Sequence, residues 1–196
     1  MPYPAEHKAR TRARIVESAR VMFNRHGFEQ VSIDDIMKDA GLTRGGFYSH
    51  FESKDELYAV AVHSFSSCNP FALEQATRMG KGRPASKRKL AVMLIEMYLS
   101  DETLENVDVQ CPLIALPSDV ARAGLKPRAA YTQLVENMRA VFRAGMEGDR
   151  EAERKALLIV NLCVGGMIIA RTTDDPKLRT SLRATAKAEA MRLLVP

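Results

Sequence analysis

The side chains with the clearest chemical potential in this chain lie in and around residues 43–54. Thr43, Arg44 and Gly45 are consecutive, and an arginine can donate two parallel hydrogen bonds to the edge of one guanine. A second set carries hydroxyl, imidazole and ammonium groups that can donate to phosphate oxygens. This set comprises Ser32, Tyr48, His50 and Lys54. Such residues can read bases and hold a nucleic-acid backbone if the local structure presents them on one surface.

The segment that must position these side chains has the start and stop signals of two short helices. Ser32 with Asp35 has the spacing of a capping box at the first helix. Gly41 can adopt the left-handed backbone conformation that ends this helix, and Thr43 can cap the next one. The pattern predicts a helix-turn-helix, in which the second helix enters the major groove and its N-terminal residues meet base edges.

Upstream, residues 8–27 are predicted to form an amphipathic helix with an apolar stripe that includes Ile15 and Phe23. Residues 1–25 contain six basic and two acidic residues, a net charge of +4, whereas residues 1–63 balance nine basic against nine acidic residues. The net charge of the whole chain, +5, is compatible with a polyanionic partner. Bulk charge therefore does not predict DNA binding; the local basic arm and the helix-turn-helix pattern do.

The stretch from about Arg12 to Ala61 resembles the N-terminal domain of the TetR family of bacterial transcriptional regulators. The run GLTRGGFYSHFESKDEL is highly specific for that family. The matching residues are Ile15, Ala19, Phe23, Gly27, Ile33, Ile36, Ala40, Gly41, Phe47, Tyr48, His50, Phe51, Lys54 and Leu57. The resemblance covers roughly the first third of the chain, and the rest is similar only in its helical layout.

The resemblance implies an all-α homodimer that binds a palindromic operator on double-stranded DNA. It implies a three-helix DNA-binding domain over residues 8–53, a connecting helix over 54–67, and a larger helical ligand-binding and dimerisation domain over 68–196. A small molecule in the larger domain then changes the separation of the two readers and releases DNA. Carried over by position, the base-reading candidates are Thr43, Arg44 and Gly45, and the phosphate candidates are Ser32, Tyr48, His50 and Lys54. The pair Gly45-Gly46 is a mild departure, which leaves the operator sequence open.

Helices are also predicted throughout the second part of the chain. Pro127 suits the first position of a helix that ends near residue 147. Residues 157–170 are nearly all apolar, but a run of 14 is too short to span a bilayer and predicts a buried helix rather than a membrane contact. Gly165 and Gly166 would allow close helix packing, and we expect the last two long helices to form the dimer interface. The alternative is that this apolar helix is the core of one subunit.

The effector pocket is expected among the central helices of the larger domain. Methionines adapt to irregular shapes and aromatic side chains line pockets, so an apolar or aromatic small molecule would suit the candidate lining. The candidates are Met93, Met97, Tyr98, Tyr131, Met138 and Phe142. The alternative is that this stripe is an ordinary hydrophobic core.

A second hypothesis concerns Cys111, which precedes Pro112. If Pro112 begins a helical turn, Cys111 caps it, and a helix N-terminus lowers a thiol pKa and favours the reactive thiolate. Cys111 would then sense an electrophile or oxidant and weaken DNA binding. The alternative is a packed, unreactive thiol, which is what we expect of Cys163 within the apolar run.

Other classes of function find no support in the sequence. The four histidines and three cysteines lack metal-ligand spacing, and there is no HExxH, paired CxxC or P-loop motif, so no metal, cofactor or enzyme activity is predicted. The polar, basic N-terminus has no apolar stretch, so we expect a cytoplasmic protein. The basic run 79–89 is interpreted as a solvated loop, with an extra phosphate contact as the alternative.

Two functions stay open at this point. The first is a ligand-responsive regulator, most simply a repressor, released by a small molecule or by an electrophile or oxidant. The second is a helical protein-interaction module without a specific operator. Activation rather than repression is also compatible with the sequence, because it depends on where the operator lies.

Overall fold

The computed structural model describes residues 5–68 and 86–195, and within these ranges all regular elements are helices. The first group comprises α1 (Ala5–His26), α2 (Ile33–Asp39), the 3₁₀ helix η1 (Arg44–Ser49) and α3 (Lys54–Cys68). The second comprises α5 (Lys87–Tyr98), α6 (Asp101–Glu105), η2 (Val107–Val109), α7 (Pro112–Ala115), α8 (Pro117–Arg122), α9 (Leu125–Gly145), α10 (Ala152–Thr172) and α11 (Pro176–Leu193). The all-α prediction is confirmed. Residues 79–85 of the basic run lie outside the described residues.

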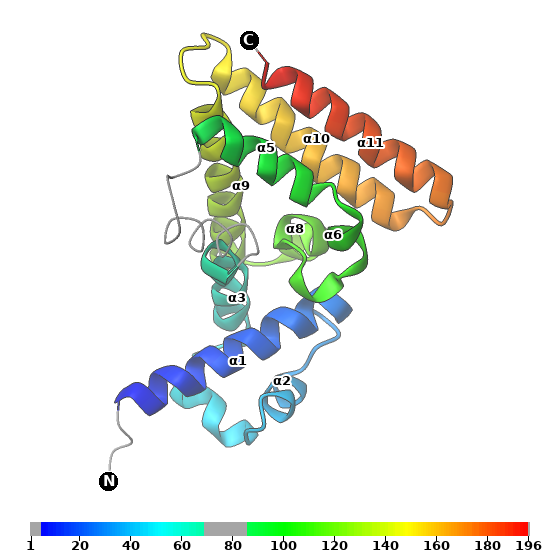
Figure 1. Ribbon diagram of the computed structural model, residues 1–196. Coiled ribbons are helices and arrows are strands. Elements are labelled where there is room, and N and C mark those ends of the chain that lie inside the picture. Colours follow the sequence, from blue (N-terminus) through cyan, green and yellow to red (C-terminus); the bar gives the residue numbers. More distant parts are fainter. Residues whose placement is uncertain (1–4, 69–85, 196) are drawn as a thin grey trace.

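The N-terminal helices α1, α2 and η1 form a small unit at one end of the molecule, with α3 leading away from it (Figure 1). Its core is aromatic: Phe23 stacks edge-on against Tyr58, with ring centroids 5.0 Å apart, and Phe47 lies 5.7 Å from Phe51. Phe23, Phe47 and Tyr58 are fully buried. Burying such a side chain contributes roughly 1.5–3 kcal/mol, so this core holds the short helices in place.

The junction between α2 and η1 has the predicted punctuation. The Ser32 hydroxyl accepts a hydrogen bond from the Asp35 amide at 3.1 Å, and the Asp35 carboxylate accepts one from the Ser32 amide, which completes the capping box. Gly41 has φ of +64°, as the helix stop requires. The Ser18 hydroxyl on α1 donates to the carbonyl of Ile36 at 3.1 Å. Local signals and one contact from α1 therefore fix the turn.

Two helix predictions need correction. The second helix of the reader is a six-residue 3₁₀ helix rather than an α-helix, which agrees with the poor α-helix propensity of Gly45 and Gly46. The helix α9 begins at Leu125, so Pro127 is its third residue rather than its first. A proline is tolerated anywhere in the first turn, because the amides there have no partner within the helix.

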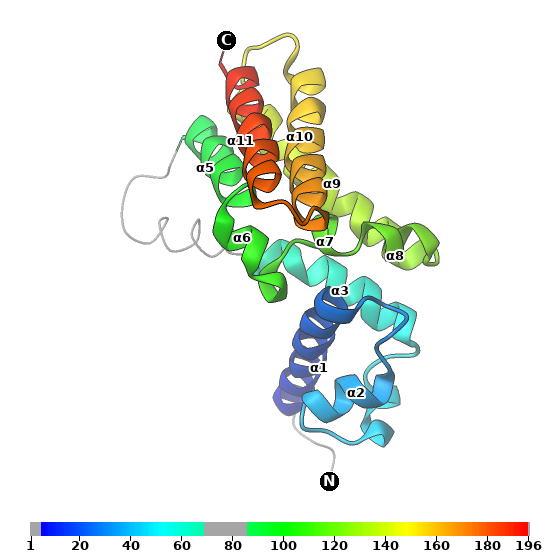
Figure 2. The ribbon, with the colours of Figure 1, turned by 90° about the vertical axis from the view of Figure 1, so that its right-hand side faces the viewer.

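The C-terminal helices α5, α9, α10 and α11 form a bundle, in which α10 and α11 lie side by side in both views (Figure 1, Figure 2). The helix α3 packs along α9 and against α1, and so joins the bundle to the N-terminal unit. A Cβ on Gly166 would lie 2.8 Å from the Cβ of Ala186, so the glycine lets α10 approach α11 closely. The predicted close approach is therefore found within one subunit.

The apolar run 157–170 lies within α10, which is 21 residues long. By length and composition alone α10 is able to cross a membrane, so the length argument against a membrane span is wrong. Its packing argues for a core helix instead: α10 contacts α5, α6, α7, α9 and α11, and Ile159, Cys163 and Met167 are fully buried.

Candidate DNA-binding surface

The three predicted base readers lie together at the start of η1, and all are exposed. Thr43 is the N-cap residue, but its side chain makes no capping hydrogen bond, so the hydroxyl is available to a ligand. No atom lies within 4 Å of a Cβ built on Gly45, so its backbone faces open space. The Arg44 guanidinium projects beside them. The structure thus brings a hydroxyl, a guanidinium and bare backbone to one surface.

Arg44 is held by a residue that the sequence reasoning did not identify. Its Nη1 lies 2.6 Å from Oδ2 of Asp34, in the first turn of α2. More than half of each side chain is exposed, and such pairs contribute about 0–1 kcal/mol. The ion pair therefore orients the guanidinium at little cost to its later exchange for a base. Ten residues separate the partners, and no local spacing rule predicts the contact.

The phosphate candidates differ in how free they are. Tyr48 is 61% exposed, and its ring is braced edge-on against Phe47 with centroids 5.2 Å apart. The Lys54 ammonium lies 4.2 Å from the centroid of the Phe28 ring, and partial burial lowers its pKa. The Ser32 hydroxyl already donates to the Asp35 carboxylate. A phosphate would have to compete for Ser32, so Tyr48 and Lys54 are the better placed donors.

His50 follows η1 and lies where the basic arm of α1 converges on the reader. Burial lowers its pKa first, and the positive charges of Lys8, Arg12 and His7 lower it further. Its Nδ1 is buried without a hydrogen-bond partner in the described parts of the chain. Arg12 also lies over the Phe51 ring, 4.6 Å from its centroid. Lys8 and Arg12 are thus further candidates for phosphate contact, which the sequence indicated only as a general basic arm.

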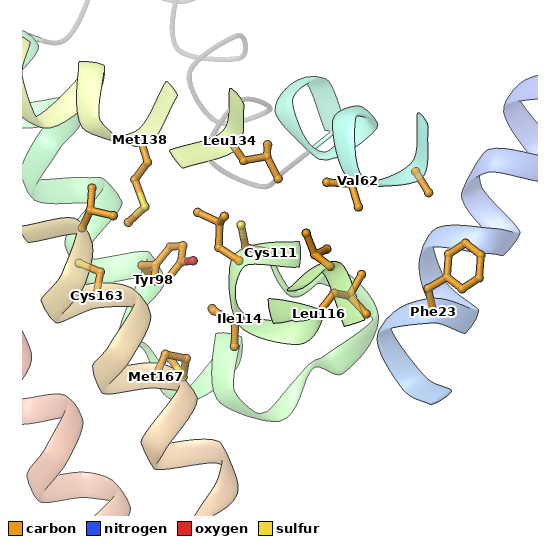
Figure 3. Packing of buried hydrophobic residues seen from close by; sticks show 14 of the residues in the cluster. Phe23, Val62, Tyr98, Cys111, Ile114, Leu116, Leu134, Met138, Cys163 and Met167 are labelled. Atoms are coloured by element: carbon orange, nitrogen blue, oxygen red, sulfur yellow. The ribbon is translucent and has the colours of Figure 1, made fainter. Parts of the chain in front are cut away.

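The six pocket candidates lie on α5 and α9 and face the interior of the bundle. Tyr98, Met138 and Phe142 are buried, and the other three are partly buried against the same core. Figure 3 shows Tyr98 and Met138 directed toward each other in this core. Three hollows of about 1000, 590 and 300 Å³ that described residues line contain none of the six in their walls. The pocket assignment stays a prediction.

Cys111 occupies the predicted position but lacks the predicted reactivity. It is the N-cap residue of α7, with Pro112 at the first helical position. However, the thiol is buried, and removal of solvent raises its pKa to about 12. The expectation of a lowered pKa is therefore wrong, because burial outweighs the helix N-terminus. Cys163 is fully buried with a pKa also raised to about 12, in agreement with a core role.

A second surface feature is an apolar strip along the outer faces of α10 and α11. It lines the hollow of about 590 Å³ and includes Leu158, Gly165, Ile169, Leu178 and Leu182. Ile169 is 52% exposed and Leu178 is 47% exposed. No atom lies within 4 Å of a Cβ built on Gly165. Of the two adjacent glycines, Gly166 therefore serves packing within the subunit, whereas Gly165 opens onto the strip.

Known proteins resemble the chain in both sequence and fold. The family model described as "Bacterial regulatory proteins, tetR family" matches residues 15–61. The HTH-type transcriptional regulator YdgC of Bacillus subtilis (strain 168) is 33% identical over 195 residues, which cover 94% of this chain and 91% of that protein. Other curated regulators match only the first third of the chain, over about 30% of their own length.

Solved structures share the whole fold. Reduced NemR of E. coli aligns with a TM-score of 0.71 and 16% identity, over 91% of this chain and 96% of that one. RolR in complex with resorcinol aligns with a TM-score of 0.57 and 16% identity, over 98% and 96%. The helix-turn-helix with its exposed readers and the bundle behind it are thus a recurring combination.

Proposed function

Because the chain belongs to the TetR family of bacterial transcriptional regulators, and is therefore a DNA-binding regulator, we propose that it is a homodimeric repressor released from a palindromic operator by a small apolar or aromatic molecule. One observation carries the proposal: Thr43, Arg44 and Gly45 are exposed together at the start of η1. It would act in the cytoplasm, where the DNA is.

In this proposal Arg44 reads a guanine after exchanging Asp34 for the base edge. The neighbouring Gly45 allows the backbone to approach the groove. Tyr48, His50 and Lys54 set the register by contacting phosphates, together with Lys8 on α1. Phosphate contacts add affinity for any sequence, so specificity rests on Arg44 and its two neighbours.

Dimerisation is proposed through the apolar strip on α10 and α11. A two-fold interface places the same patch of both subunits face to face. Leucine and isoleucine side chains half exposed on a long apolar helix are the composition that such an interface requires. A second copy of the chain is the occupant we propose, and it would hold two readers at the fixed spacing that adjacent half-sites need.

The effector is proposed to bind in the bundle among the predicted candidates on α5 and α9. Their lining is apolar and aromatic, with Tyr98 and Tyr131 as the polar groups that orient a ligand. RolR, which has the same fold, was crystallised with resorcinol, a small aromatic molecule. This supports an aromatic effector here. The buried, protonated Cys111 argues against release by thiolate oxidation.

Selection of bound sequences from random duplex DNA, at near-physiological salt, tests the proposal directly. Enrichment of a palindrome whose half-sites lie in successive major grooves is the expected result. The selection is repeated with protein that has been unfolded and refolded to remove bound ligand. If refolded, dimeric protein still enriches no sequence, the operator proposal is wrong, and the helix-turn-helix serves another contact, such as one with a protein.

A further inference from the structure

One buried polar residue, Gln110, joins three separate parts of the molecule. It is 1% exposed. Its Nε2 donates to the carbonyls of Thr103 at 2.8 Å and Leu104 at 3.2 Å, and its Oε1 accepts from Nη1 of Arg171 at 2.7 Å. Its backbone carbonyl accepts from Nδ2 of Asn24 at 2.9 Å. Every polar group of Gln110 is used, which fixes the side chain in a single arrangement.

On one side Gln110 is tied to the DNA-binding unit. Asn24, buried on α1, also donates to the carbonyl of Val107 at 3.1 Å. Arg20 donates to the carbonyl of Asp108, and the Arg25 guanidinium pairs with the Asp108 carboxylate. The last two turns of α1 therefore grip the backbone of residues 107–110. Figure 1 shows this segment against the C-terminal end of α1.

On the other side Gln110 is tied to the last turn of α10 through Arg171. The guanidinium is half buried and its Nη1 contacts two neutral oxygens, Oε1 of Gln110 and the carbonyl of Ile114 at 3.5 Å. No carboxylate pairs with it among residues 5–68 and 86–195. A partly desolvated cation left without its acceptor is costly. The end of α10 and Gln110 are therefore expected to move together.

The next residue in the chain leads into the bundle core. The Cys111 thiol lies beside the Tyr98 hydroxyl (Figure 3), and the Tyr131 hydroxyl donates to the carbonyl of Leu113 at 3.2 Å. Both tyrosines belong to the proposed effector lining. A ligand that shifts either ring displaces residues 111–113 and, through the backbone, Gln110.

We propose that Gln110 is the positioning residue that couples the effector-binding bundle to the DNA reader, with Arg171 and Asn24 as its two attachments. The proposal rests on the proposed function for what is bound at each end. It touches neither DNA nor effector. Because coupling between two sites is reciprocal, DNA binding must be felt at the end of α10 through the same residue.

Hydrogen exchange on the full-length protein, with and without the selected operator duplex, tests this coupling. Arg171→Met removes the attachment at α10. Arg179→Met is the matched control, because Arg179 donates to the carbonyl of Ala170 at 3.1 Å at the same end of α10 and is not bonded to Gln110. Arg171→Lys keeps one donor and serves as the rescue variant.

Without DNA, Arg171→Met is expected to speed exchange at amides 20–26 of α1 by on the order of 3- to 30-fold. Arg179→Met leaves these amides unchanged, and Arg171→Lys restores slow exchange. With operator, the wild-type protein slows exchange at residues 107–114 and 166–172. In Arg171→Met the slowing no longer reaches residues 166–172. If Arg171→Met does not fold, Asn24→Ala tests the same path from α1, with faster exchange expected at residues 166–172.

Equal effects of Arg171→Met and Arg179→Met on α1 overturn the proposal, because they mean a general loosening of the bundle. So does undiminished slowing at residues 166–172 in both Arg171→Met and Asn24→Ala. If no duplex is bound but the DNA-free amides of α1 respond to Arg171 alone, the operator proposal fails while the coupling stands.

Discussion

Arg44 has two competing partners, and this makes its role measurable. Replacing it with alanine removes an exposed ion pair with Asp34, so the free energy of unfolding should change by less than about 1 kcal/mol. Binding to the selected operator should weaken by about 1–3 kcal/mol, and the preference for a guanine at one position should relax. Titration against the operator and its single-base variants measures both effects. Asp34→Ala is the control: it frees the guanidinium, and discrimination at that position should persist.

Lys54 should behave differently, because a phosphate contact carries no sequence information. Lys54→Met keeps the aliphatic stem against Phe28 but removes the charge. We expect affinity to fall alike for operator and unrelated DNA. The slope of log affinity against log salt concentration should become shallower by about one unit. An unchanged slope would place Lys54 away from the phosphates.

His50 should make operator binding depend on pH. In the free protein its pKa is lowered by burial and by Lys8, Arg12 and His7, so the side chain is neutral near pH 7. A phosphate contact stabilises the charged form and raises the pKa in the complex, which therefore takes up a proton. Affinity should rise as pH falls through the bound-state pKa and level off below the free-state pKa. Titrations across this range with His50→Asn, which should lack that component, isolate it from other groups; equal slopes would contradict the contact.

At the scale of elements, the 3₁₀ geometry of η1 and its glycines make one prediction. An alanine side chain at position 45 meets no protein atom within 4 Å, so Gly45→Ala should fold with unchanged or slightly greater thermal stability. Operator affinity should nevertheless fall, because the added methyl group enters the space that DNA is proposed to fill. Melting temperature and operator Kd measured on the same preparation separate the two effects. Wild-type affinity would show that the backbone at position 45 does not approach DNA.

What the sequence allowed us to predict follows from how local each signal is. The capping box at Ser32 and the stop at Gly41 involve neighbours within a few residues, and both were found. The burial of Cys111 depends on packing around it, so its helix position was predicted and its pKa was not. Gln110 could not be identified, because its partners Asn24 and Arg171 are 86 and 61 residues away.

At the scale of the whole molecule, the apolar strip on α10 and α11 decides whether two readers act together. Leu178→Glu places a charge on a side chain that is already 47% exposed in one subunit, so the monomer should tolerate it. A desolvated carboxylate facing its own copy should prevent association. Leu125→Glu is the matched control, because Leu125 is 84% exposed and lies outside the strip.

Sedimentation at micromolar concentration should give the mass of a dimer for the wild-type protein and Leu125→Glu, and that of a monomer for Leu178→Glu. Loss of the second reader removes the gain from bivalent binding, so affinity for the palindrome should fall by on the order of 100-fold or more. Affinity for an isolated half-site should stay the same, since η1 lies in the other unit. A dimeric Leu178→Glu protein with full operator affinity would mean that the two readers are joined through a different surface.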